Sequence, residues 1–235
     1  MKLTGSILRQ SDFGAALTAE LYQIYAAYYA PTSLAMFARD LASKAYAIIV
    51  RTPDGRVCGF STVARLRISA EGREVEVLFS GDTVVERPHW GEQTLPFRWI
   101  EEAGRIKSER PDVPLYWLLI TKGHRTFRYL PGFAKTYCPG PHQNLRALRD
   151  AIAGQVFGGR FDARTGILRP DPDCPTALRP EFAGLDAARI DNPHVRAFLS
   201  QNPGHAGGDE LVCLCALSAE NLRPRARRQF LKGMG

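Results

Sequence analysis

The sequence predicts an α/β protein of the α+β kind, in which helices flank a mixed, mostly antiparallel sheet. Two early stretches have apolar residues at helical spacing, and three strands separated by tight turns follow them. A helical segment then leads into the continuous apolar strand PLYWLLIT. Because a helix between two strands usually joins a parallel pair, we expect one parallel pairing inside an otherwise antiparallel sheet.

Two helices are expected first. Residues 13–30 (FGAALTAELYQIYAAYYA) repeat apolar side chains with the helical period, and Pro31 directly after them predicts the end of that helix. A second helix is expected over 33–43. The period then changes to that of a strand, so both helices precede the sheet.

A meander of three antiparallel strands is expected over 45–51, 57–68 and 74–79. The TPDG turn after the first strand has a proline that presets φ and a glycine that accepts positive φ. The third strand, EVEVLF, alternates strictly, as a half-buried strand does. We therefore expect Glu74 and Glu76 on the solvent face, after which residues 80–92 form a loop.

The second half of the chain completes the sheet. We expect a helix over 94–107, followed by a central strand over 114–121 that lies parallel to 74–79 and splays from it. A short helix over 122–130 is expected to stop at Pro131. The remaining expected elements are a helix over 142–157, a strand over 211–217 and a last helix over 219–231. The segment 158–209 is rich in proline and glycine. It is expected to be an irregular, mobile insertion or lid before the last strand, within one domain spanning 1–235.

Composition favours a folded protein without metal or membrane span. Of 235 residues, 45% are hydrophobic and 23% charged, which is ordinary for a globular domain. No apolar run reaches the roughly 18–20 residues that cross a bilayer, and no secretion signal opens the chain. A cytoplasmic location is expected. The cysteines lack zinc-site spacing and are expected to be buried, reduced thiols: Cys58, Cys138, Cys174, Cys213 and Cys215.

The net charge of +7 is concentrated near the C-terminus. Such a cluster either binds a polyanionic ligand or nucleic acid, or forms a solvated helix end whose cations favour the dipole. No aromatic side chains of the kind that stack on bases interleave with it, which disfavours nucleic acid. The cluster comprises Arg223, Arg225, Arg227, Arg228 and Lys232.

The loop after the third strand, VVERPHWGEQTL over 84–95, resembles the cofactor loop of the GNAT acyltransferase family. Gly91 matches the family's first glycine, whereas Trp90 stands where a basic residue is usual and Gln93 where a second small residue is usual. In that family, backbone N–H groups at a helix N-terminus bind the pyrophosphate of coenzyme A. The resemblance implies cofactor contacts by Phe79, Ser80, Trp90, Gly91, Glu92, Gln93 and Thr94.

A second segment, Tyr129-Leu130-Pro131-Gly132-Phe133, is similar to the family's Tyr-x-x-x-Gly-Phe with one residue fewer. The resemblance implies that Tyr129 protonates the departing thiolate, a role that suits a hydroxyl of pKa near 10. It also implies a general base on the third strand, for which Glu76 is the candidate. Candidate substrate contacts, with helix caps or a solvated turn as the alternative, are Asp82, His89, His124 and Arg125.

The resemblance covers residues 15–137 and 211–217. It implies an N-acyltransferase that takes an acyl group from acyl-CoA or from an acyl carrier protein and gives it to an amine of a small molecule or peptide. Two other functions stay open, a catalytically silent member of the fold that binds a ligand or partner, and a nucleic-acid binder. A homodimer is also open. No Gly-x-Ser-x-Gly, P-loop or HExxH motif points to another chemistry.

Overall fold

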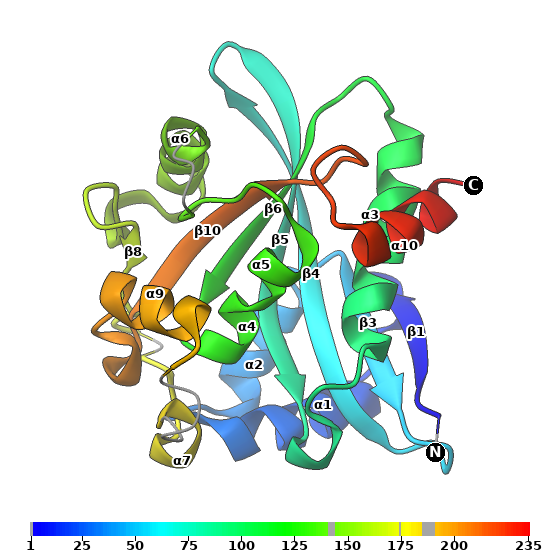
Figure 1. The fold of residues 1–235 in the computed structure, drawn as a ribbon. Coiled ribbons are helices and arrows are strands. Elements are labelled where there is room, and N and C mark those ends of the chain that lie inside the picture. The colour runs from blue at the N-terminus through cyan, green and yellow to red at the C-terminus, as the bar shows by residue number, and fades with distance from the viewer. Residues whose placement is uncertain (1, 141–143, 174, 185–190) are drawn as a thin grey trace.

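An eight-stranded sheet forms the centre of the protein (Figure 1). The computed structural model describes residues 2–140, 144–173, 175–184 and 191–235. In sheet order, the strands are β1 (Thr4–Arg9), β3 (Tyr46–Arg51), β4 (Val57–Ala70), β5 (Arg73–Val85), β6 (Leu115–Thr121), β10 (Glu210–Ala216), β8 (Ile167–Leu168) and β7 (Phe161–Asp162). A separate pair consists of β2 (Tyr29–Ala30) and β9 (Ala177–Leu178).

The expected parallel pairing is confirmed. β5 and β6 run parallel, with Glu76 opposite Leu115 at one end and Ser80 opposite Leu119 at the other. The helix α3 (Thr94–Glu109) makes the crossover between them. The other neighbours in the main sheet pair antiparallel. The architecture is therefore the mixed, mostly antiparallel sheet flanked by helices that the sequence predicts.

Helices cover both faces of the sheet. The front layer, which faces the viewer in Figure 1, packs around Trp99, Trp117 and Phe127, and the back layer packs around Phe37, Phe60 and Ile152. The front layer comprises α3, α4 (His124–Phe127), α5 (Tyr129–Phe133), α9 (Pro193–Gln201) and α10 (Pro224–Met234). The back layer comprises α1 (Ala15–Tyr28), α2 (Leu34–Leu41) and α6 (Arg146–Phe157).

Several elements differ from the expectation. The last helix, expected over 219–231, runs over Pro224–Met234, because Pro224 takes a first-turn position and starts it. β5 continues through residues 80–85, expected as loop, because these residues still pair with β4. The edge strand β1 was missed, since six residues with mixed polarity give a weak pattern. Helix α5 includes Pro131, which was expected to stop it. Pro131 stands in the first turn, where its missing N–H breaks no helical hydrogen bond.

The segment 158–209 is more regular than expected. Its strands β7 and β8 extend the main sheet, and β9 pairs with β2. Its helices are α7 (Pro180–Ala183) and α9, whose Val195 and Phe198 are fully buried. The mobility of this segment stays a prediction for hydrogen exchange to test. Short 3₁₀ turns occur at Gln10–Asp12 (η1), Arg87–His89 (η2), Gly158–Arg160 (η3) and His205–Gly207 (η4).

The prediction of buried, reduced cysteines is confirmed for those that the structure describes. Cys58, Cys138, Cys213 and Cys215 are buried and free of disulfides. Burial raises the pKa of the Cys213 thiol well above its usual value, which keeps it protonated and unreactive. Cys174, like the start of the helix expected at 142, lies outside the described residues.

Candidate active site

The candidate site lies where β5 and β6 separate. Ser80 is the last residue of β5 that pairs with β6, yet β5 continues along β4 to Val85. Ser61 faces Thr83 and Val63 faces Ser80, so a bulge of β5 stands opposite one residue of β4. The bulge consists of Gly81 and Asp82, opposite Thr62. It turns β5 away from β6 and leaves an opening between the strands.

The bulge is held by side chains of β4. The N–H of Asp82 donates to Thr62 Oγ1 at 3.1 Å, and the hydroxyls of Ser61 and Thr83 lie 2.8 Å apart. A Cβ on Gly81 would stand about 3.1 Å from Thr62 Oγ1 and 3.3 Å from Lys44 Nζ. Glycine therefore lets a buried lysine approach the backbone where the strands part.

A front pocket of about 510 Å³ opens beside the N-terminus of α3. We call it the donor pocket. Gly91 in its wall has φ +100°, a left-handed conformation that glycine adopts without strain. The first N–H groups of a helix have no intrahelical acceptor and favour an anion. Gln93, which directly precedes α3, lines the pocket, whereas Thr94, expected as a cofactor contact, does not. The pocket lining also includes His89, Trp90, Glu92, Phe97, Arg125, Arg128, Tyr129 and Arg225.

Hydrogen bonds within the loop and a cation–π contact hold the wall of the donor pocket in place. The indole N–H of Trp90 donates to the Val85 carbonyl at 2.8 Å, and the Arg125 guanidinium lies 3.9 Å from the Trp90 ring centre. Trp90 therefore anchors the loop and holds an arginine over the pocket. The Gln93 amide donates to the Gly91 carbonyl at 2.8 Å, so this side chain bonds within its own loop.

A pocket of about 430 Å³ opens on the back side of the same separation. We call it the acceptor pocket. Its walls come from α1, α2, the bulge, the end of β6 and residues 157–176. Tyr29, Phe37 and Phe79 supply aromatic surface. Charged side chains of both signs line it: Arg39, Asp40, Lys44, Asp82, Lys122, Arg160, Asp171 and Glu210.

The two pockets meet through the opening. A small connecting pocket of about 100 Å³ shares Trp90, Arg125 and Tyr129 with the donor pocket, and Tyr29, Thr83 and Thr126 with the acceptor pocket. Tyr129 also lines a narrow apolar cavity with Trp99 and Trp117. A molecule entering from the front can therefore present its end group to one entering from the back, at Thr83 and Thr126.

Two candidate residues from the sequence analysis, Tyr129 and Asp82, lie near this junction and have raised pKa values. Burial raises the pKa of Tyr129, so its hydroxyl stays protonated at neutral pH. Burial, and after it the negative charge of Asp40, raises the pKa of Asp82 to about 7. Lys44 and Lys122 act in the opposite direction. Asp82 is therefore poised between its two protonation states near neutral pH.

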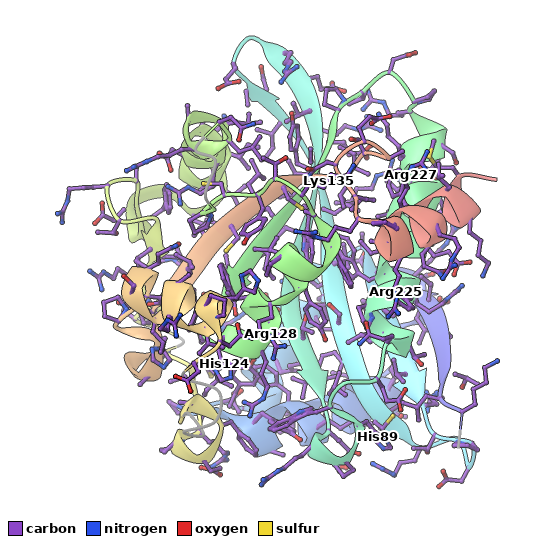
Figure 2. The ribbon with its side chains drawn as sticks, in the orientation of Figure 1. His89, His124, Arg128, Lys135, Arg225 and Arg227 are labelled. Carbon is purple, nitrogen blue, oxygen red and sulfur yellow. The ribbon has the colours of Figure 1, made fainter. Side chains whose placement is uncertain are left out.

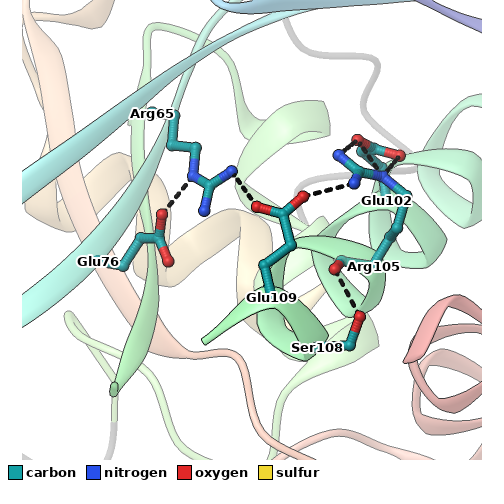
Figure 3. A network of polar contacts seen from close by, with 6 residues as sticks. All are labelled: Arg65, Glu76, Glu102, Arg105, Ser108 and Glu109. Atoms are coloured by element: carbon teal, nitrogen blue, oxygen red, sulfur yellow. Dashed lines mark hydrogen bonds and ion pairs between the residues drawn. The ribbon is translucent and has the colours of Figure 1, made fainter. Parts of the chain in front are cut away.

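Glu76 does not lie where a base is needed. Its side chain is buried rather than on the solvent face, and it pairs with Arg65, which also pairs with Glu109 at 2.6 Å (Figure 3). Glu109 in turn contacts Arg105 of α3. Glu76 lies opposite Leu115, at the far end of the parallel pairing, and lines none of the pockets above. We correct its exposure and do not retain it as the base.

The remaining candidates divide between the pockets. His89 lies in the donor pocket, so its expected contact with the acceptor substrate finds no support. His124 and Arg125 line the connecting pocket, and Phe79 and Asp82 line the acceptor pocket. The sequence analysis did not single out Lys44, Glu210 and Arg128 as site residues, whereas Arg225 belongs to the basic cluster for which a polyanionic ligand was one expectation.

In the described part of the chain, neither a metal-binding cluster nor a helix that could span a membrane is found. Within it, no group of three or more His, Cys, Asp or Glu side chains is arranged to hold a metal ion. Of the helices described, none combines the length and apolar character needed to cross a bilayer.

Comparisons with known proteins find partial similarity to solved acyltransferase structures and no sequence match. No family model matches the sequence, and no curated protein sequence matches it. A probable N-acyltransferase of unknown function from Enterococcus faecalis is 12% identical over 57% of this chain and 33% of its own length, with a TM-score of 0.42. The match thus spans about a third of that protein.

Two structures from Escherichia coli are also similar. One is the GNAT family N-acetyltransferase YhbS in complex with CoA, with 12% identity, coverage of 57% and 70%, and a TM-score of 0.37. The other is ElaA, with 15% identity, coverage of 60% and 90%, and a TM-score of 0.38. At these values we derive function from the chain's own residues.

Proposed function

We propose that this protein is an N-acyltransferase that moves an acyl group from a phosphopantetheine thioester to an amine. One observation carries the proposal: pockets from opposite faces of the sheet meet at Thr83 and Thr126, where β5 and β6 separate. Direct transfer between two substrates needs such an arrangement, because it holds both reacting groups in one place.

The donor pocket fits the phosphates of an acyl-CoA. It combines the N-terminus of α3, a glycine with positive φ and the guanidinium groups of Arg125, Arg128 and Arg225, against one carboxylate, Glu92. A bound acyl thioester supplies an electrophilic carbonyl and a thiol leaving group. The pocket leads past Tyr129 towards the opening, so the thioester end is directed to the junction.

Asp82 is the proposed general base. A protonated amine in the acceptor pocket must lose a proton before its nitrogen can attack the carbonyl. A carboxylate with pKa about 7 accepts that proton efficiently near neutral pH. Tyr129, on the donor side, is the proposed acid, since its hydroxyl holds a proton for the departing sulfur.

The acceptor pocket suggests the chemistry of the amine. Lys122 and Glu210 pair at 3.5 Å in its interior, and Lys44 pairs with Asp40 at 2.7 Å near its mouth. Carboxylates are available for an ammonium group, and lysines are available for an anionic group. The pocket therefore fits a small amine that also carries an acidic group better than a purely apolar one.

The test is a transfer assay with purified protein. Acetyl-CoA and longer acyl-CoAs are mixed with a panel of small amines and amino acids, thiol release is followed, and the acylated product is identified by mass spectrometry. Asp82→Asn should abolish most of the signal, whereas Asp112→Asn, an exposed aspartate between α3 and β6, should not. Binding of thioester without any product over the panel would favour the silent-binder alternative.

A further inference from the structure

A cluster of exposed cations surrounds the start of α10. Figure 2 shows Arg225, Arg227 and Lys135 around this helix, with Arg128 on the neighbouring short helices. Arg223 and Arg228 belong to the same exposed set. We call these six residues the basic face. It lies on the front layer, next to the donor pocket, which Arg128 and Arg225 line.

Several arginines elsewhere in the protein form ion pairs. Arg56 pairs with Glu86 at 2.7 Å, Arg105 with Glu102 at 2.6 Å, and Arg98 with Glu101 at 3.0 Å. Across the described residues, by contrast, no ion pair is formed by any member of the basic face. Its charge is thus available to a partner.

An apolar groove lies within the basic face. It has a volume of about 620 Å³, an apolar floor that includes Leu222, Pro224 and Leu231, and a rim on which three cations, Lys135, Arg227 and Arg228, outnumber one carboxylate, Glu220. Leu231 is 40% exposed although it is a large apolar side chain. On the opposite side of α10, Ala226 and Phe230 are buried. The exposed leucine therefore cannot turn inward without unburying these residues.

An apolar floor with a charged rim is the pattern of a protein interface rather than of a phosphate site. A phosphate would use the cations but not the leucine. The groove lining also has no aromatic side chain on which a nucleobase could stack. The occupant that uses both features is an acidic amphipathic helix, with carboxylates at its edges and apolar side chains at its centre.

The start of α10 borders both the groove and the donor pocket, because Pro224 lines the first and Arg225 lines the second. Coenzyme A and an acyl carrier protein carry the same phosphopantetheine arm and differ in what lies beyond its phosphate. A carrier protein whose arm enters the donor pocket brings its own surface against α10.

We propose that the acyl donor is an acyl carrier protein that docks an acidic helix in the groove between Lys135 and α10. This proposal rests on the proposed acyl transfer. It assigns Lys135, Arg227 and Arg228 at the groove to the carrier protein, and the donor pocket, with Arg128 and Arg225, to the phosphopantetheine arm.

The first test measures docking without chemistry. An apo acyl carrier protein, which lacks the arm, is titrated into the wild-type protein by calorimetry at low and moderate salt. We expect binding that weakens with salt and is lost by about tenfold or more in Arg227→Glu/Arg228→Glu. Leu231→Ser should weaken it while keeping every charge. Arg164→Glu, on the β7–β8 turn with a side chain 86% exposed, is the matched control and should bind as wild type. Failure of wild-type protein to bind would overturn the proposal.

The second test compares donors, after melting curves confirm that the variants fold. Arg227→Glu/Arg228→Glu should lower kcat/KM for acyl carrier protein by about tenfold or more and change kcat/KM for the same acyl group on CoA by less than twofold. Equal losses with both donors would assign the basic face to the nucleotide of CoA and overturn the proposal. Duplex DNA or tRNA that binds the face more tightly than the carrier protein would also overturn it. If neither donor supports transfer but apo carrier protein still docks as described, the proposed function fails while the docking surface stands.

Discussion

The indole N–H of Trp117 donates a 2.7 Å hydrogen bond to the hydroxyl of Ser80. Both residues are buried, and Ser80 is the last residue of β5 that pairs with β6. Trp117 also lies against Trp99 of α3, with ring centres 4.6 Å apart. The bond therefore joins the two strands and the crossover helix at the point where the strands part.

Ser80→Ala should destabilise the protein, because it leaves a buried indole N–H without an acceptor. The expected loss is about 1–3 kcal/mol in the free energy of unfolding. Ser69→Ala, an exposed serine near the far end of β4, should change stability by less than about 0.5 kcal/mol. Urea denaturation of both variants measures this. Equal stability of the two would mean that the indole finds another partner.

Asp82→Asn should lower kcat by roughly 10²–10⁴-fold with small effect on thioester binding, since it removes the proposed base. In the wild type, the rate should fall as pH drops through about 7, because Asp82 then becomes protonated. That acidic limb should be absent from the residual activity of the variant. A variant that keeps the limb would place the base elsewhere.

The same raised pKa predicts an effect on stability. The folded state holds the Asp82 proton more tightly than the unfolded state. The contribution of this proton to the free energy of unfolding is therefore complete below about pH 4 and is lost as the pH rises to about 7. Asp82→Asn cannot ionise. It should therefore be more stable than wild type at pH 8 and lose that advantage near pH 4, as measured by denaturation at both values. A pH-independent difference would contradict the shift.

Glu76→Gln should affect stability rather than turnover. The substitution removes the charge that pairs with Arg65 in a buried position and should cost about 1–3 kcal/mol in the free energy of unfolding. Glu74→Gln is the control, since Glu74 lies on the same strand with a half-exposed side chain. If Glu76→Gln lost turnover while keeping its stability, Glu76 would regain its role as candidate base.

The sequence predicted the parts of the site that depend on local pattern. A helix placed between two strands indicated the parallel pairing of β5 and β6. The family resemblance placed Gly91 in a loop before a helix, where the structure has it, and the binding of an anion there stays a prediction. The strict alternation of β5 placed Glu74 and Glu76 on one face correctly. It could not show that the end of α3, with Glu109, covers that face over Glu76.

The acceptor pocket could not be predicted, because its charges come together only through topology. Lys44 stands before β3, Lys122 follows β6, and Glu210 begins β10. Each is an ordinary polar residue at the end of an element, and none belongs to a motif. The sequence analysis named Asp82 as a candidate substrate contact but not as a base. Its raised pKa depends on burial and on the charge of Asp40 from another element, which the sequence does not show.

Gly91→Glu should abolish acetyl-CoA binding. It adds a carboxylate to a pocket that collects arginines, and it forces a side chain into φ +100°. Gly91→Ala separates the two causes, because it brings the strain without the charge and should weaken binding less. Gly154→Glu, at an exposed position in α6, is the control for adding a glutamate. Calorimetry with acetyl-CoA compares them, and equal binding by Gly91→Glu and wild type would remove the phosphates from this loop.

Tyr129→Phe should separate binding from turnover. The Tyr129 ring lies 5.7 Å from the Phe133 ring, so phenylalanine keeps the packing and loses only the hydroxyl. If that hydroxyl protonates the departing sulfur, kcat should fall by roughly 10²–10⁴-fold while the Kd for the thioester stays within about twofold. Tyr116→Phe removes a hydroxyl that accepts a hydrogen bond from Arg73 at 3.4 Å and lines none of the pockets above, so it should leave kcat unchanged. Thiol release and calorimetry on the same preparations measure both quantities. Wild-type turnover in Tyr129→Phe would show that the thiolate departs without this proton, and Asp82 would then remain the single proposed proton-transfer group of the site.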